Sequence, residues 1–343
     1  MKQRLLEKLA RIRANPAGRD FLLADAKDPD MAFGILSPGR VYPPLPGRDG
    51  VYRTLGEFHD QIRRIVRQGL VDLMLTSVAT MSALGHRERL FDSSDVTPAV
   101  RINDSSDIWC VRGGSYRRCL SLPFASAYLE EARFGTLAPR SGARPLVDLG
   151  LYSITLNNDP HADRETLAAL KGFRAEAQRH GFHYFLEVFA PNTAAGLSPE
   201  QVPAFVNDHI ARLLAGVPVE GRPLFLKLPY FGPQWMEELV AYDPTQVIGV
   251  LGGISGTTYD AFKLLAEAQR HGARAAIFGR KIKDAEEPLT FIAMLRRIVD
   301  GELSPEEAVD AYHGELQKLG IPPHRRQNDD RQLTTPELQY AAR

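Results

Sequence analysis

Short apolar runs separated by polar loops and helical patterns recur along the 343-residue chain. Clear runs occupy residues 21–25, 71–76, 146–156, 183–189, 224–230, 246–251 and 274–279, and we expect a further strand at residues 108–111. Runs that are apolar on both faces and alternate with helices predict a parallel sheet covered by helices. About eight such units favour a closed (β/α)8 TIM barrel over an open sheet. The pattern is irregular over residues 90–145, which match no recognisable motif.

No composition shift divides the chain, so we expect one barrel with an N-terminal helix over residues 1–321. The polar residues 322–343 follow it as a C-terminal tail, either exposed or laid on a neighbouring subunit of a homo-oligomer. Residues 35–58 are rich in proline and glycine and predict a long loop after the first strand. Loops after strands lie on the catalytic face of such barrels, so this loop is expected to form part of the rim or a lid.

The composition argues against nucleic acid and membranes as partners. Lys plus Arg and Asp plus Glu are equal at 42 each, so no net charge attracts nucleic acid or an anionic membrane. Two cysteines, Cys110 and Cys119, are too few for a disulfide scaffold and lack the spacing of zinc ligands. The first residues form a charged amphipathic pattern, and no stretch approaches the roughly 18 apolar residues of a membrane span. These features are typical of a soluble cytoplasmic protein.

One lysine stands out because of its position. Lys227 lies in the middle of the apolar run PLFLKLP at residues 223–229, which predicts a buried strand. Burial disfavours the ammonium ion, and a neutral amine is able to attack a carbonyl carbon. The alternative is a lysine that is paired with a carboxylate for stability alone.

Further polar or glycine-rich positions fall at or near strand ends, where barrel enzymes carry their active residues. Asp25 closes the first run, and Glu187 lies within the apolar run FLEVF at residues 185–189. Asp25 has the alternative of capping a helix, and Glu187 that of serving only as the buried partner of Lys227. In either case Glu187 and Lys227 are expected side by side, on consecutive strands.

Two successive strand ends are glycine-rich: GGISG at residues 252–256 and Gly279-Arg280. Such loops often only make tight turns, but barrel phosphate sites are commonly built from the loops after strands seven and eight. Backbone N–H groups and one guanidinium suit an anion. We therefore expect a phosphate site at Gly252, Gly253, Ser255, Gly279 and Arg280.

The order of these residues resembles the class I aldolases of the deoxyribose-phosphate and tagatose-bisphosphate aldolase group. The resemblance is carried by FLEV at 185–188, FLK at 225–227 and IFGR at 277–280. It implies that Lys227 forms a Schiff base with a ketose or deoxyketose, and that Gly279 and Arg280 bind its phosphate. No cofactor and no metal are implied. A metal-dependent aldolase would need several histidines at strand ends. Of the nine histidines here, His183 begins its strand, on the wrong face, and most of the others are expected in helices or loops.

One departure from the family concerns strand four, where many members carry a second lysine. Residues 147–152 read VDLGLY and contain no lysine, so Tyr152 or Asp148 becomes the candidate for proton transfer there. In the implied mechanism Glu187 or Tyr152 shuttles protons, and Asp25 binds hydroxyl groups or relays protons. Two alternatives remain: a phosphosugar isomerase or synthase that uses Glu187 and Asp25 as acid and base, and a non-catalytic barrel that binds a sugar phosphate.

Overall fold

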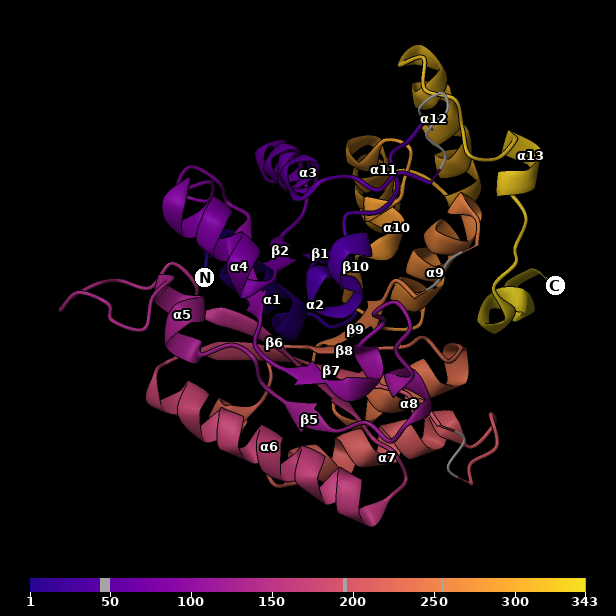
Figure 1. Cartoon of the computed structure of the whole chain (residues 1–343). Helices are drawn as coiled ribbons and strands as arrows, with labels where there is room; N and C mark the ends of the chain where they lie inside the picture. Colours follow the sequence, from indigo (N-terminus) through magenta and orange to yellow (C-terminus); the bar gives the residue numbers. More distant parts are fainter. Residues whose placement is uncertain (44–49, 194–195, 254–255, 343) are drawn as a thin grey trace.

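Eight parallel strands close into a barrel in the computed structural model, which describes residues 1–43, 50–193, 196–253 and 256–342 (Figure 1). Around the barrel the strands follow the order β1-β10-β9-β8-β7-β6-β3-β2, and every neighbouring pair is parallel. The prediction of a (β/α)8 TIM barrel is confirmed. In chain order the strands are β1 (Leu22–Lys27), β2 (Leu73–Thr76), β3 (Thr97–Arg101), β6 (Leu149–Thr155), β7 (His183–Phe189), β8 (Leu226–Leu228), β9 (Ile248–Leu251) and β10 (Ala275–Phe278).

Helices surround the barrel, and additional short elements lie in the loops after the strands (Figure 1). The longer helices are α1 (Gln3–Ala14), α3 (Leu55–Gln68), α6 (Pro160–Arg179), α7 (Val202–Ala215), α8 (Pro233–Tyr242), α9 (Thr258–Arg270), α11 (Pro288–Val299) and α12 (Pro305–Lys318). The shorter ones are α2 (Asp30–Phe33), α4 (Val78–Met81), α5 (Leu129–Phe134), α10 (Arg280–Lys283) and α13 (Gln327–Asp330). None of the helices in the described parts of the chain is long and apolar enough to cross a membrane.

Local sequence signals set the ends of these helices. Helix α3 begins with a capping box in which the Thr54 side chain accepts from the Glu57 N–H and the Glu57 carboxylate accepts from the Thr54 N–H. It ends at Gly69, whose φ of 72° is in the left-handed region that glycine adopts without strain. Helix α9 begins with the same kind of box, formed by Thr257 and Asp260. These signals explain why the helical segments begin and end where they do.

The apolar core has two layers. Alternate strand residues, such as Leu22, Leu149 and Phe185, fill the barrel interior. The residues between them, such as Leu23 and Met74, pack outward against the helices. This alternation is the two-residue period of a β-strand, so the parity of a residue along its strand decides whether its side chain reaches the interior.

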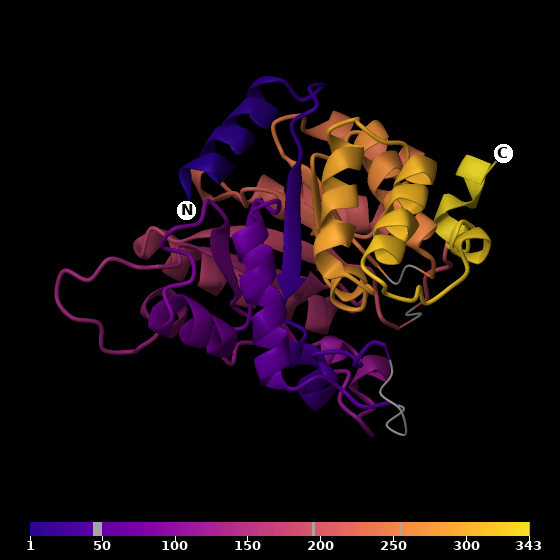
Figure 2. The same ribbon diagram turned by 90° about the horizontal axis from the view of Figure 1, so that it is seen from above.

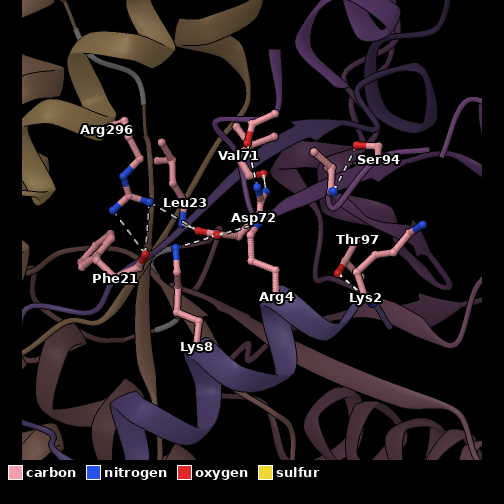
Figure 3. A network of polar contacts seen from close by, with 12 residues as sticks. Lys2, Arg4, Lys8, Phe21, Leu23, Val71, Asp72, Ser94, Thr97 and Arg296 are labelled. Carbon is pink, nitrogen blue, oxygen red and sulfur yellow. Dashed lines mark hydrogen bonds and ion pairs between the residues drawn. The ribbon is translucent and has the colours of Figure 1, made fainter. Parts of the chain in front are cut away.

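Helix α1 lies at the end of the barrel where β1 begins (Figure 2). Its residues Leu5, Leu9 and Ile12 are buried and belong to the same cluster as the barrel interior. Asp72, just before β2, lies among cations at this end, as Figure 3 shows: Lys8 Nζ is 2.6 Å from its carboxylate, and Arg4 and Arg296 are each 3.5 Å away. The Leu23 N–H also donates to Asp72, at 2.9 Å.

The prediction of a strand at residues 108–111 is wrong. The third strand is β3, which the sequence pattern hides because it is short and contains Pro98 and Arg101. Residues 104–124 instead carry the short antiparallel strands β4 (Asp104–Ser105) and β5 (Pro123–Phe124) with 3-10 turns between them. Trp109 packs edge-on against Tyr116 and Phe124 at centroid distances of 5.1 and 4.8 Å, so its apolar surface is used within this segment and not in the barrel.

The C-terminal residues fold back on the barrel of their own chain. Asp330 accepts from the Thr258 N–H at the start of α9, at 2.8 Å, and the Asp260 carboxylate accepts from the Thr334 N–H, at 2.7 Å. Leu338 is fully buried. The expectation of an exposed tail is therefore wrong at Asp330 and Leu338, although most of the other residues from 322 onward are exposed.

Candidate active site

A buried ion pair joins two neighbouring strands inside the barrel. Glu187 on β7 and Lys227 on β8 are partners in the strand register, and Lys227 Nζ lies 2.5 Å from Glu187 Oε1. Their side chains are 2% and 8% exposed. Phe185 and Phe225, two residues earlier on the same strands, belong to the interior cluster, so this pair also faces the interior. The two residues lie side by side, as their consecutive strands predict.

The ion pair continues into a chain of polar groups across the barrel. Ser153 on β6 donates to Glu187 Oε2 at 2.6 Å and accepts from Arg101 Nη2 at 2.9 Å. Arg101, at the end of β3, is 3.8 Å from Glu187 and donates to Asp28 at 3.0 Å. Two cations and two carboxylates thus alternate, which offsets part of the cost of burying them. The arrangement holds the Glu187 carboxylate between two cationic groups.

Residues 104–124 cover the ends of the strands that carry this network (Figure 1). Asp107 accepts from Thr155 at the end of β6, at 2.8 Å. Ser121 and Asn157 exchange hydrogen bonds, and Asn192, just after β7, donates to the Cys119 carbonyl at 2.6 Å. Residues 104–124, part of the segment that matched no motif, therefore form a cover over the C-terminal ends of β6 and β7.

Two residues proposed for hydroxyl binding or proton transfer, Asp25 and Tyr152, point away from the interior and do not join the pair of Glu187 and Lys227. Asp25 is fully buried and 3.0 Å from Lys27, also fully buried; burial raises the pKa of Asp25 to about 6 and lowers the pKa of Lys27. Tyr152 stacks on Phe173 of α6 with a centroid distance of 4.5 Å, and burial raises its pKa to about 12. Both residues have the outward parity of their strands.

Asp148, the other candidate on strand four, lies at the opposite end of the barrel, where it pairs with the N-terminal ammonium group. The interior positions that sequence reasoning missed are Asp28, Arg101 and Ser153. A signal for Arg101 is present, since it ends the apolar run PAVR at 98–101. Ser153 is one residue after Tyr152, and Asp28 is three residues after Asp25. Because side chains alternate between the two faces of a strand, Ser153 and Asp28 point inward where Tyr152 and Asp25 point outward.

The predicted phosphate site is partly assembled. Gly252, Gly253, Gly279 and Arg280 come from the ends of the neighbouring strands β9 and β10, whereas Ser255 lies outside the described residues. The Gly252 N–H donates to the Ile277 carbonyl at 3.1 Å, so it is part of the strand ladder. Gly253 has a φ of 59°, and a Cβ at Gly279 would lie 2.9 Å from the Ala26 carbonyl oxygen. Close packing thus accounts for Gly279 even without an anion.

The N-terminus of α9 and the Arg280 side chain differ in their availability to a ligand. The Thr258 N–H of α9 is bonded to Asp330 of the C-terminal segment. Arg280 is partly open to solvent, yet burial by the surrounding protein lowers the pKa of its guanidinium, an effect that Asp284 and Glu187 partly oppose. The Arg280 side chain is therefore open to a ligand, whereas the Thr258 N–H is not.

In the described parts of the chain, no three His, Cys, Asp or Glu side chains gather in a way that could hold a metal ion. The polar groups of the interior are an amine, a guanidinium, a hydroxyl and two carboxylates. Such a set can exchange protons and can offer a nucleophilic nitrogen to a carbonyl group.

No protein-family model and no curated protein matches the chain. Solved structures do. A fructose 1,6-bisphosphate aldolase from an archaeon is 19% identical with a TM-score of 0.58, over 87% of this chain and 99% of that one. A fructose-bisphosphate aldolase from Slackia heliotrinireducens is 16% identical with a TM-score of 0.63, over 90% and 91%.

A protein from Corynebacterium glutamicum is 17% identical with a TM-score of 0.57, over 88% of this chain and 99% of that one. At these identities the likeness concerns the fold, and it extends over nearly the whole of each structure. The chain is thus structurally similar, along most of its length, to barrels described as fructose-bisphosphate aldolases.

Proposed function

We propose that this protein is a class I aldolase that cleaves or forms a carbon–carbon bond of a phosphorylated ketose or deoxyketose through a Schiff base on Lys227. The observation that carries the proposal is the position of Lys227, inside the barrel and 2.5 Å from Glu187. The fold-level likeness to fructose-bisphosphate aldolases supports it.

The proposed chemistry begins with proton transfer. Glu187 accepts a proton from the Lys227 ammonium, and the neutral amine attacks the substrate carbonyl carbon. Loss of water gives an iminium ion. The hydroxyl group on the β carbon then loses its proton, and the electrons of the bond between the α and β carbons move toward the iminium nitrogen. The bond breaks to an aldehyde and an enamine, the enamine carbon is protonated, and water releases the second product and the free amine.

Arg101 and Ser153 are proposed as positioning residues for Glu187. Family members often carry a second lysine on strand four, whereas here that strand offers the Ser153 hydroxyl to Glu187 at 2.6 Å. The second cation near the carboxylate is Arg101 on β3, at 3.8 Å. Arg101 cannot exchange its proton at neutral pH, so its role is electrostatic and proton transfer falls to Glu187.

The non-catalytic alternative has one specific observation in its favour. A lysine at 2.5 Å from a carboxylate is also what a purely ionic contact looks like. In that case the barrel would bind a sugar phosphate without forming a covalent bond to it. Only a covalent iminium can be reduced to a permanent adduct, so chemical trapping separates the two functions.

The test is reductive trapping on the full chain. The protein is incubated with fructose 1,6-bisphosphate or, separately, with deoxyribose 5-phosphate, reduced with sodium borohydride and mapped by peptide mass spectrometry. We expect an adduct on Lys227 that disappears in Lys227→Met and in samples without borohydride. Labelling at Lys27 or Lys281, or no labelling with a wider panel of ketose and aldose phosphates, would reject the assignment.

A phosphate group of the substrate is proposed to bind at Gly253, Gly279 and Arg280, and at Ser255 if the predicted loop contributes its hydroxyl. Arg280→Ala should weaken binding of a phosphorylated substrate by roughly 1.5–3 kcal/mol, the range for a charge-assisted hydrogen bond. The measurement compares phosphorylated and unphosphorylated forms of the same sugar. An equal effect on both forms would mean that Arg280 does not bind the phosphate.

A further inference from the structure

A cavity of about 720 Å³ opens beside Arg280. One wall comes from described residues of the segment after β1, within 33–42 and 50–52, and the other from Arg280, Lys283 and Asp284 together with His324. The volume is within the range of roughly 300–1,000 Å³ that is typical of small-molecule sites. Lys227 and Glu187 do not line it, so the cavity lies beside the ion pair of the barrel interior and reaches Arg280 of the proposed phosphate site.

Aromatic rings form much of the wall. Phe33, Tyr42, Tyr52 and His324 all line the cavity. Tyr42 packs edge-on against His324 with a centroid distance of 3.9 Å, and its hydroxyl donates to the Pro322 carbonyl at 2.7 Å. These contacts fix one ring of the wall between the two parts of the chain. Rings held in this way offer flat surfaces against which another ring can stack.

The charged groups of the wall are mainly cationic. Arg40, Arg280 and Lys283 line the cavity with a single carboxylate, Asp284. Lys283 is already paired with that carboxylate at 2.5 Å. Within the described residues, neither Arg40 nor Arg280 has a carboxylate within 4.0 Å. The Arg40 guanidinium instead lies 5.9 Å from the centroid of the Tyr52 ring. Among the residues that the structure describes, the two guanidinium groups of the cavity therefore have no ionic partner.

We propose that this cavity binds an anion that carries a flat ring, of the nucleoside diphosphate class. Two guanidinium groups match the paired acceptor oxygens of phosphates, and an aromatic wall matches a base. A simple phosphate would leave the aromatic wall without a partner, and a neutral aromatic molecule would leave both guanidinium groups unpaired. Only a ligand with both parts uses the whole lining.

The site shares Arg280 with the proposed phosphate site but does not require a Schiff base on Lys227, so the test separates nucleotide binding from the proposed aldolase function. Calorimetric titration of the full chain with adenosine 5′-diphosphate is compared with adenosine, which lacks the anion, and with pyrophosphate, which lacks the ring. We expect the diphosphate to bind at least about tenfold more tightly than either part, because each part makes only some of the contacts. Lys227→Met should bind it as the wild-type protein does.

Substitutions on the wall sharpen the test, and Arg280 is left unchanged because it belongs to the proposed substrate site. Arg40→Gln should weaken binding by about tenfold, as loss of a charge-assisted contact does. Tyr52→Leu should weaken it by about threefold, whereas Tyr52→Phe, which keeps the ring, should not. The matched control is Arg179→Gln, which removes an exposed guanidinium on α6.

Three results would overturn the proposal. The first is no binding of the diphosphate at millimolar concentration. The second is an equal effect of Arg40→Gln and Arg179→Gln, which would indicate a general charge effect. The third is binding of pyrophosphate as tight as that of the diphosphate, which would remove the ring from the site. Thermal unfolding of each variant establishes that it is folded before its binding is compared.

Discussion

Each end of the barrel buries a carboxylate among cations, but the cations come from different parts of the fold. At the end closed by α1, the partners of Asp72 are Arg4 and Lys8 of α1 and Arg296 of α11 (Figure 3). At the other end, the partners of Glu187 are Lys227 and Arg101, which belong to the barrel strands themselves. One network ties helices to the barrel, and the other lies within it.

This difference bears on what each network is for. The contacts of Asp72 attach α1, whose apolar face closes the barrel interior, so the ion pairs and the hydrophobic contacts serve the same packing. The ion pair of Glu187 attaches nothing to the barrel, since its neighbouring strands are already joined by backbone hydrogen bonds. Buried charge without such a structural role is typical of a functional site, and barrel enzymes carry theirs at this end.

The largest effect that we expect is a loss of turnover when Glu187 is replaced by its isosteric amide. Glu187→Gln keeps the size of the side chain but cannot exchange the proton. It should still form the borohydride-trappable adduct, although more slowly because the amide cannot accept the Lys227 proton, and turnover should fall by at least ~100-fold, the low end of general acid–base contributions. Steady-state rates with the substrate identified by trapping provide the measurement. Near-normal turnover would make Glu187 a structural partner, like Asp72.

The corresponding change at the other end should affect stability and not chemistry. Asp72→Asn removes the charge that three cations share, and we expect the free energy of unfolding to fall by about 2 kcal/mol. This is less than a fully buried pair would lose, because Arg4, Lys8 and Arg296 are 30%, 15% and 14% exposed and keep part of their hydration. Urea unfolding measures the loss. A drop in turnover per folded molecule comparable to that of Glu187→Gln would break the distinction between the two ends.

The smallest expected effect concerns the hydroxyl between Arg101 and Glu187. Ser153→Ala removes two hydrogen bonds but leaves Glu187 paired with Lys227 and Arg101 paired with Asp28. We expect turnover to fall about fivefold, which corresponds to about 1 kcal/mol, through poorer positioning of the carboxylate. A matched control is Ser94→Ala near the other end, whose hydroxyl donates to the Val66 carbonyl. Equal effects of the two variants on turnover would remove Ser153 from the positioning role.

Local patterns in the sequence were enough to predict the barrel and the pair of Glu187 and Lys227. Apolar runs alternating with helices predicted the barrel, because a strand buried on both faces must be apolar throughout. The same rule made Glu187 and Lys227 visible, since a charge in such a run is costly. Capping boxes at Thr54 and Thr257 mark helix starts that are likewise local. These features depend on neighbours along the chain.

Tertiary structure alone decided which residues join that pair. On a strand that is apolar on both faces, the sequence carries no polar alternation to indicate which face is inward, so Tyr152 could not be distinguished from Ser153, nor Asp25 from Asp28. Arg101 reaches the network only because β3 pairs with β6, across the long segment that separates the two strands in the sequence. Those choices rest on contacts between segments far apart in the chain, which local patterns do not contain.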